Sequence, residues 1–183
     1  MILKQLGFGD IEQMVLGTPA HVYGLIPAFL SAWIADKYKN MRAAVIIANQ
    51  IILIAGTAMY SQLGASQKVA RYAGIFLAVG SSNANVPLVV AWAQTSIRRQ
   101  SKRGYVSGLV VLAGGIGGIL ASVTFINKEA TKGYPTGVFF CIACNALSLV
   151  LFGLLYVYFK YQNRRADRGE VVLEDDVNFR YQG

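Results

Sequence analysis

Five long stretches without a charged residue constrain this chain more than any other feature of its sequence. They contain 23, 25, 26, 24 and 27 residues, and they lie between Glu12 and Asp36, Arg42 and Lys68, Arg71 and Arg98, Arg103 and Lys128, and Lys132 and Lys160. A helix needs about 20 mostly apolar residues to cross the hydrocarbon core of a bilayer. The pattern therefore predicts an all-α membrane protein with about five transmembrane helices.

The predicted transmembrane domain covers residues 18–159, with spans at about 18–35, 43–61, 72–97, 105–126 and 136–159. Thr18 and Pro19 suit the cap and first turn of the first span. Residues 1–17 are predicted to be an external segment or the remnant of a lost helix. The polar tail at 160–183 is predicted to be mostly disordered.

Composition excludes several other classes of protein. Hydrophobic residues make up 55% of the 183 residues and charged residues 14%, whereas soluble domains carry about 25% charged residues. Disorder requires low hydrophobicity, and a disulfide-stapled fold requires more than two cysteines. The net charge of +8 is spread between apolar stretches rather than gathered on one face, so we expect no nucleic-acid partner. The expected partner is the lipid bilayer.

The positive charges between the stretches predict an orientation. Lysines and arginines in alternate connections and termini number 12 on one side and 5 on the other. The richer side is cytoplasmic by the positive-inside rule, which places the C-terminus inside and the N-terminus outside. Residues 1–16 lack the pattern of a signal peptide. We therefore expect that the chain is truncated and lacks N-terminal helices.

Amide side chains and a proline interrupt the third span. Asn83, Asn85 and Gln94 put polar groups in or near the membrane, where unpaired polar groups are costly. Pro87 removes a backbone donor and is expected to break or kink the helix. The segment is either a kinked helix that faces a substrate or a site of hydrogen bonding between helices.

The fourth span is rich in glycine. Gly114 and Gly118 are four residues apart, with Gly115 and Gly117 between them, and small residues at that spacing permit close helix contact. These four glycines are predicted to be packing residues. The cluster does not match a dinucleotide-binding motif, because Leu120 stands where the last glycine would be.

The remaining polar residues offer little chemistry. His21, the only histidine, is either a proton relay or an interfacial packing residue. Cys141 and Cys144 lie inside an uncharged span and are interpreted as small apolar residues. Because the sequence shows no metal-ligand spacing, acid pair or nucleophile with a base, we predict no enzyme, no cofactor and no metal site.

Several short motifs resemble the C-terminal half of a major facilitator superfamily transporter. The loop Ala35-Asp36-Lys37 with Arg42 looks like a short cytoplasmic motif of that superfamily. Further segments are similar to the fungal anion:cation symporter branch, which includes allantoate, nicotinate and pantothenate permeases: Asn83-Ala84-Asn85-Val86-Pro87, Lys102-Arg103, Gly114-Gly115-Ile116-Gly117-Gly118-Ile119, Tyr134-Pro135-Thr136-Gly137, Ala166-Asp167-Arg168-Gly169-Glu170 and Phe179-Arg180-Tyr181. The sequence departs from that branch at Lys39, Thr95, Ser96 and Ile126.

The resemblance implies that the five spans correspond to helices 8–12 of a twelve-helix carrier. In such a carrier the substrate binds between two halves near the midplane, so we expect this chain alone not to transport. The resemblance implies secondary active transport of a small organic anion across the plasma membrane, coupled to protons in the complete carrier. Asn83, Asn85 and Trp92 are the predicted substrate-binding residues, and Asp36 with Arg42 the predicted gating pair. A membrane scaffold and a pore are the alternatives.

Overall fold

A computed structural model shows an all-helical chain, which confirms the predicted fold class. It describes residues 10–38, 41–62, 67–125 and 134–182. The helices are α1 (Asp10–Lys37), α2 (Arg42–Gln62), α3 (Lys68–Thr95), α4 (Gln100–Thr124) and α5 (Pro135–Asp167). Two positions named above, Lys39 and Ile126, and residues 1–9 of the predicted external segment lie outside the described residues.

Four of these helices are long and apolar enough to cross a membrane, judged by length and composition: α2, α3 from Val69, α4 and α5. α1 has 28 residues but contains two prolines, Pro19 and Pro27, and is not among the four found in the described part of the chain. The predicted first span is therefore helical, and its crossing of the bilayer stays a prediction.

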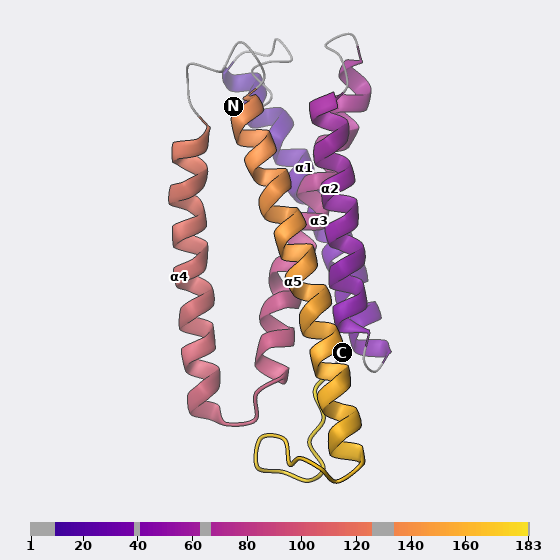
Figure 1. The fold of residues 1–183 in the computed structure, drawn as a ribbon. Coiled ribbons are helices and arrows are strands. Elements are labelled where there is room, and N and C mark those ends of the chain that lie inside the picture. The colour runs from indigo at the N-terminus through magenta and orange to yellow at the C-terminus, as the bar shows by residue number, and fades with distance from the viewer. Residues whose placement is uncertain (1–9, 39–40, 63–66, 126–133, 183) are drawn as a thin grey trace.

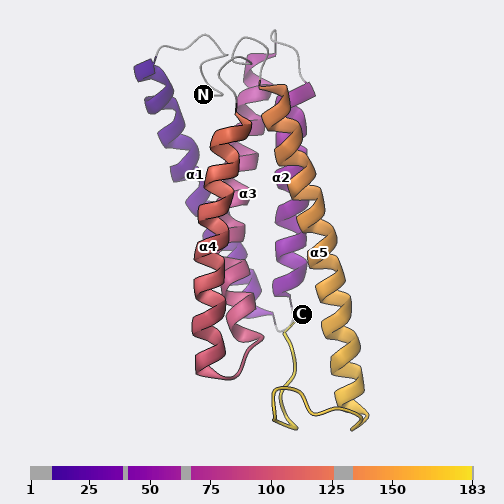
Figure 2. The ribbon, with the colours of Figure 1, turned by 60° about the vertical axis from the view of Figure 1, so that its left-hand side comes forward.

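The helices run side by side, with α3 in the middle (Figure 1). α3 packs most extensively on α2 and α1, and α5 packs on α2. The end of α1, the α3–α4 connection and the end of α5 lie toward the same end of the bundle (Figure 2). We call this the basic end, because it carries Lys37, Arg42, Arg98, Arg99, Lys102, Arg103, Lys160, Arg164, Arg165 and Arg168.

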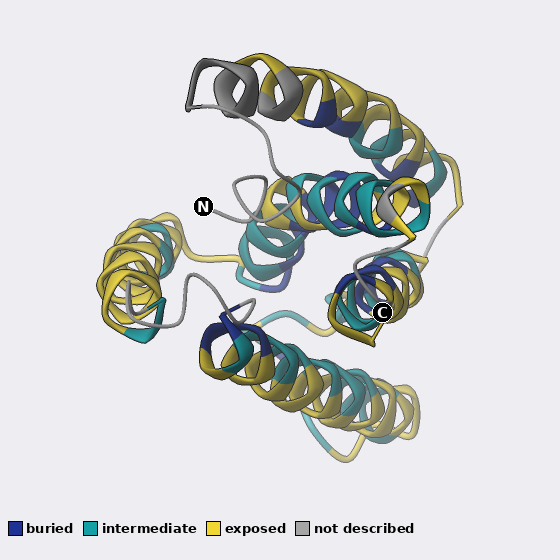
Figure 3. Ribbon diagram, turned by 90° about the horizontal axis from the view of Figure 1, so that it is seen from above, coloured by how far each residue is buried: buried dark blue, intermediate teal, exposed yellow. Residues whose placement is uncertain are grey.

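α4 stands apart from the other helices. Seen along the bundle, it is the outlying helix and is coloured almost wholly as exposed (Figure 3). None of its residues is buried, and the residues from Val111 to Val123 are all exposed. Its apolar surface is suited to lipid or to further helices.

The helices depart from the sequence predictions at three places. α1 begins at Asp10 rather than near residue 18, so Thr18 and Pro19 lie inside the helix and do not start it. α3 stays α-helical from Lys68 to Thr95, through the predicted break, because a helix flanked by neighbours can tolerate a proline. α5 continues to Asp167, since the basic residues after the span suit the C-terminal end of a helix.

The predicted disorder of the tail is also wrong. Residues 168–182 follow a defined path of turns, with an isolated bridge between Leu173 and Asp176. Acidic side chains of this segment pair with basic side chains of the α3–α4 region. A hydropathy pattern cannot reveal such long-range pairing.

Two glycines allow a close backbone approach between α2 and α3. A Cβ atom added at Gly56 would lie 2.8 Å from the carbonyl oxygen of Gly74 and 2.8 Å from the backbone nitrogen of Ala78. A Cβ added at Gly74 would lie 2.9 Å from the carbonyl oxygen of Gly56. The two backbones can therefore meet only because neither residue has a side chain.

We expect Gly56→Ala to lower the free energy of unfolding by about 1–3 kcal/mol, because the methyl group forces α2 and α3 apart. The measurement is unfolding in detergent, followed by circular dichroism. Gly153→Ala is the control: a Cβ at Gly153 meets nothing within 4 Å, and alanine is the better helix former. Equal stability of the two variants would contradict the close approach.

Candidate functional site

Five polar side chains from four helices gather inside the bundle and form the candidate site, which we call the amide cluster. Its members are Ser31 of α1, Asn49 and Gln50 of α2, Asn85 of α3 and Asn145 of α5. All except the half-buried Asn145 are buried. Within apolar helices such residues are expected to pair with one another or to serve a function.

Gln50 is the centre of the amide cluster. Its side-chain nitrogen donates to Oδ1 of Asn145 at 2.8 Å and to the backbone oxygen of Asn145 at 3.2 Å. Its Oε1 accepts a hydrogen bond from Nδ2 of Asn85 at 2.9 Å. Since Gln50 is only 4% exposed, this one side chain joins α2 to both α3 and α5 without help from solvent.

Asn85 has an unused acceptor. Its Nδ2 donates to Gln50 and, more weakly at 3.4 Å, to the backbone oxygen of Ile46. Its Oδ1 is buried and has no hydrogen-bond partner in the structure. A buried acceptor without a partner costs free energy, so this atom is suited to accept a hydrogen bond from a bound molecule or a water.

A second pair of polar side chains extends the amide cluster to α1. Nδ2 of Asn49 donates to Oγ of Ser31 at 3.0 Å, and both side chains are buried. Asn49 and Gln50 are neighbours in sequence, so α2 presents one amide toward α1 and the next toward α3 and α5. This pair ties α2 to α1.

The structure separates the three predicted substrate-binding residues. Asn85 belongs to the amide cluster, whereas Asn83 lies against α1: a Cβ at Gly24 would be 2.6 Å from Nδ2 of Asn83. Trp92 is two turns further along α3 and buried. It packs near Phe152 and Phe159, at ring-centroid distances of 6.1 and 5.5 Å.

The predicted gating residues meet at the basic end. Nη2 of Arg42 lies 2.9 Å from Oδ1 of Asp36, and Nη1 of Arg42 donates to Oγ1 of Thr95 at 3.0 Å. The Arg42 side chain is 18% exposed, so it is largely withdrawn from solvent. The guanidinium therefore links α1, α2 and the end of α3, and its role as a gate stays a prediction.

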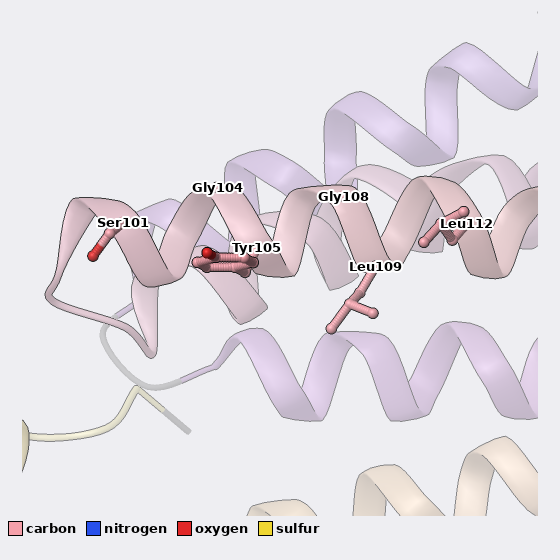
Figure 4. A pocket seen from close by; sticks show the side chains of 6 residues that line it. All are labelled: Ser101, Gly104, Tyr105, Gly108, Leu109 and Leu112. Carbon is pink, nitrogen blue, oxygen red and sulfur yellow. The ribbon is translucent and has the colours of Figure 1, made fainter.

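The predicted packing glycines contact no other element among the described residues. A Cβ at Gly114, Gly115, Gly117 or Gly118 would meet nothing within 4 Å. A hollow of about 480 Å³ lies nearer the start of α4 (Figure 4), lined by Ser101, Gly104, Tyr105, Gly108, Leu109 and Leu112. All of its lining residues come from one helix, so it is a surface hollow rather than a formed site.

Ser31 and Asn145 are members of the amide cluster that the sequence reading did not select. Asn145 is the only amide in the predicted span 136–159, and an intramembrane amide is a candidate by default. Ser31 gives no such signal, because serine is common in membrane helices. Within the described ranges, no group of three His, Cys, Asp or Glu side chains could hold a metal ion.

Comparisons with known proteins point to membrane transporters. No family model matches the chain, and no solved structure matches it at a significant level. The chain is 26% identical over 152 residues to the MFS-type transporter cnsO of Penicillium expansum; the matched stretch covers 82% of this chain and 29% of that protein. It is 25% identical over 189 residues to the MFS transporter prlL of a fungal species, strain NRRL 50135; this match covers 98% of this chain and 36% of that protein.

A third relative is the major facilitator-type transporter hxnP of Emericella nidulans. It is 23% identical over 168 residues, covering 92% of this chain and 34% of that protein. The chain thus spans about a third of the length of these curated relatives. The similarities support a relationship to the major facilitator superfamily, without pointing to its anion:cation symporter branch. They also agree with the prediction that the chain is not an enzyme.

We expect Gln50→Leu to lower the free energy of unfolding by about 1–2 kcal/mol, because it leaves Asn85 and Asn145 without their partner. Unfolding in detergent, followed by circular dichroism, measures the loss. Gln62→Leu, at an exposed position near the end of the same helix, is the matched control and should be nearly neutral. A loss of equal size in the control would show that Gln50 does not hold α2 to α3 and α5.

Proposed function

We propose that this chain forms part of a secondary transporter of the major facilitator type and that the amide cluster lies on its substrate pathway. The observation that carries the proposal is the unpartnered Oδ1 of Asn85, buried among apolar helices. Similarity to proteins named as transporters covers 82–98% of the chain and supports the same assignment.

The proposed substrate is a small organic anion. An organic anion that also carries a hydroxyl or an amide N–H group can donate to Oδ1 of Asn85, and its carboxylate oxygens can accept from amide nitrogens. Asn83 and Trp92 are proposed to contact the substrate in other conformations of the carrier. His21, exposed on α1, is a candidate for proton coupling because an imidazole can accept and release a proton.

The proposed conformational cycle uses the basic end. Arg42 contacts both Asp36 and Thr95, and these contacts favour the arrangement of α1, α2 and α3 that permits them. A gate of this kind works only if the opposite state breaks the pair. We propose that the basic end faces the cytoplasm of a cell whose plasma membrane holds the carrier, in accord with the positive-inside rule.

Uptake of radiolabelled organic acids tests the transport function. Cells that express the whole reading frame containing these 183 residues should show saturable uptake that a protonophore abolishes. Uptake that does not saturate would indicate a pore, and no uptake together with a stable co-purified partner would indicate a scaffold. Alternating access requires two halves that rock against each other, so we expect the 183-residue chain alone, in liposomes, to show no uptake.

We expect Asn85→Ala to raise the KM for uptake about tenfold, which corresponds to the loss of one hydrogen bond of about 1.4 kcal/mol. Gln94→Ala is the matched control, because Gln94 is an amide of the same helix that donates to Ser107 of α4 and lies outside the amide cluster. The control should lower protein stability but leave KM unchanged. An equal rise in KM for both variants would assign Asn85 a purely structural role.

A further inference from the structure

The chain reverses direction at the end of α5. Gly169 has φ of +72°, a left-handed conformation that glycine adopts without strain. Its N–H donates to the carbonyl oxygen of Ala166 at 3.0 Å, and the N–H of Glu170 donates to that of Arg165 at 3.1 Å. This glycine C-cap ends the helix and turns the tail back toward the bundle.

Three consecutive acidic residues of the tail then meet the basic α3–α4 region. The carboxylates of Glu174, Asp175 and Asp176 lie 3.1, 2.5 and 2.6 Å from the side-chain nitrogens of Lys102, Arg99 and Arg98, respectively. Glu174 is 14% exposed, Asp175 75% and Asp176 28%, so the middle residue projects into solvent and its two neighbours are more withdrawn from it. Each residue of the acidic turn therefore has a basic counterpart.

Beyond the acidic turn, the tail inserts an aromatic ring between helices. Tyr181 stacks on Phe159 with centroids 4.5 Å apart and planes 11° apart, and its backbone exchanges two hydrogen bonds with the Asn163 side chain, at 2.8 and 2.9 Å. Burial raises the pKa of Tyr181, and the nearby charge of Glu174 raises it further. The indole N–H of Trp92 donates to the carbonyl oxygen of Gln182 at 2.6 Å.

These contacts place the tail over a cavity of about 370 Å³ between α3, α4 and α5. The helices contribute Trp92, Phe152 and Phe159 to its lining, and the tail contributes Glu174 and Tyr181. The tail is therefore a wall of the cavity, and its removal would open the cavity toward the basic end.

We propose that residues 170–182 are an intramolecular latch that closes this cavity at the basic end of the bundle. The acidic turn holds the latch to the α3–α4 region, and Tyr181 with Gln182 covers Trp92. Ion pairs at a protein surface are individually weak, so three of them fix the tail without locking it. The latch rests on these contacts alone and does not depend on the identity of any substrate.

Trp92 itself reports whether the latch is closed. The chain has two tryptophans, so Trp33→Phe leaves Trp92 as the single fluorophore. In purified full chain in nanodiscs, acrylamide should quench Trp92 weakly while the latch is closed. Adding Glu174→Gln, Asp175→Asn and Asp176→Asn should shift the emission to longer wavelength and abolish this protection.

Glu170→Gln is the matched control for the single variant Asp176→Asn. It also removes one carboxylate from the tail, but Glu170 pairs with Arg165 and Arg168 beside it rather than with the α3–α4 region. Quenching should rise for Asp176→Asn and stay unchanged for Glu170→Gln. Exchanging the charges in Arg98→Asp with Asp176→Arg should restore the protection.

A salt titration of the Trp33→Phe chain keeps the latch testable if the triple variant does not fold. At 1 M salt the Debye length is about 3 Å, so exposed ion pairs weaken and quenching of Trp92 should rise. Quenching that is independent of salt, or equal in the triple variant and its parent, would overturn the latch.

Discussion

The hydrocarbon core of a bilayer offers no partner to a polar group, and this constraint underlies most of the structure. The backbone meets it by forming helices over most of the described part of the charge-free stretches. The side chains meet it through Gln50, which donates to Asn145 and accepts from Asn85 and so connects three helices. The close approach at Gly56 and Gly74 brings α2 and α3 near enough for the hydrogen bond between Asn85 and Gln50. Packing and polar pairing therefore depend on each other in this bundle.

The sequence predicts the helices well because a charge-free run is itself the property that a membrane selects. It predicts their ends poorly, since helical turns outside the membrane are polar and look like loops. This is why α1 begins at Asp10 and α5 reaches Asp167, both beyond the predicted spans. The path of the tail was inaccessible for a different reason: Asp175 and Arg99 are 76 positions apart, and no local pattern reports their pairing.

For the candidate site, the sequence predicts which polar residues need a partner better than it predicts which of them lie together. Asn85 is predicted because an amide in a membrane helix requires a partner, and the Asp36–Arg42 pair because its loop resembles a short motif of the superfamily. Asn83 was grouped with Asn85, yet residues two apart on a helix face different neighbours. The glycines of α4 are prominent by their number, whereas the tight contacts fall at glycines of α1, α2, α3 and α5. Which small residues meet another backbone depends on the tertiary arrangement.

The length of α5 has a mechanical consequence. Its 33 residues extend about 50 Å, well beyond the roughly 30 Å hydrocarbon core. The tail is attached to the end of the helix that extends past this core. Tilting a helix of this length by about 10° about its Pro135 end displaces its Asp167 end by about 9 Å. That displacement exceeds the reach of an ion pair. A small rocking of α5 within the membrane is thereby amplified into making or breaking contacts outside it.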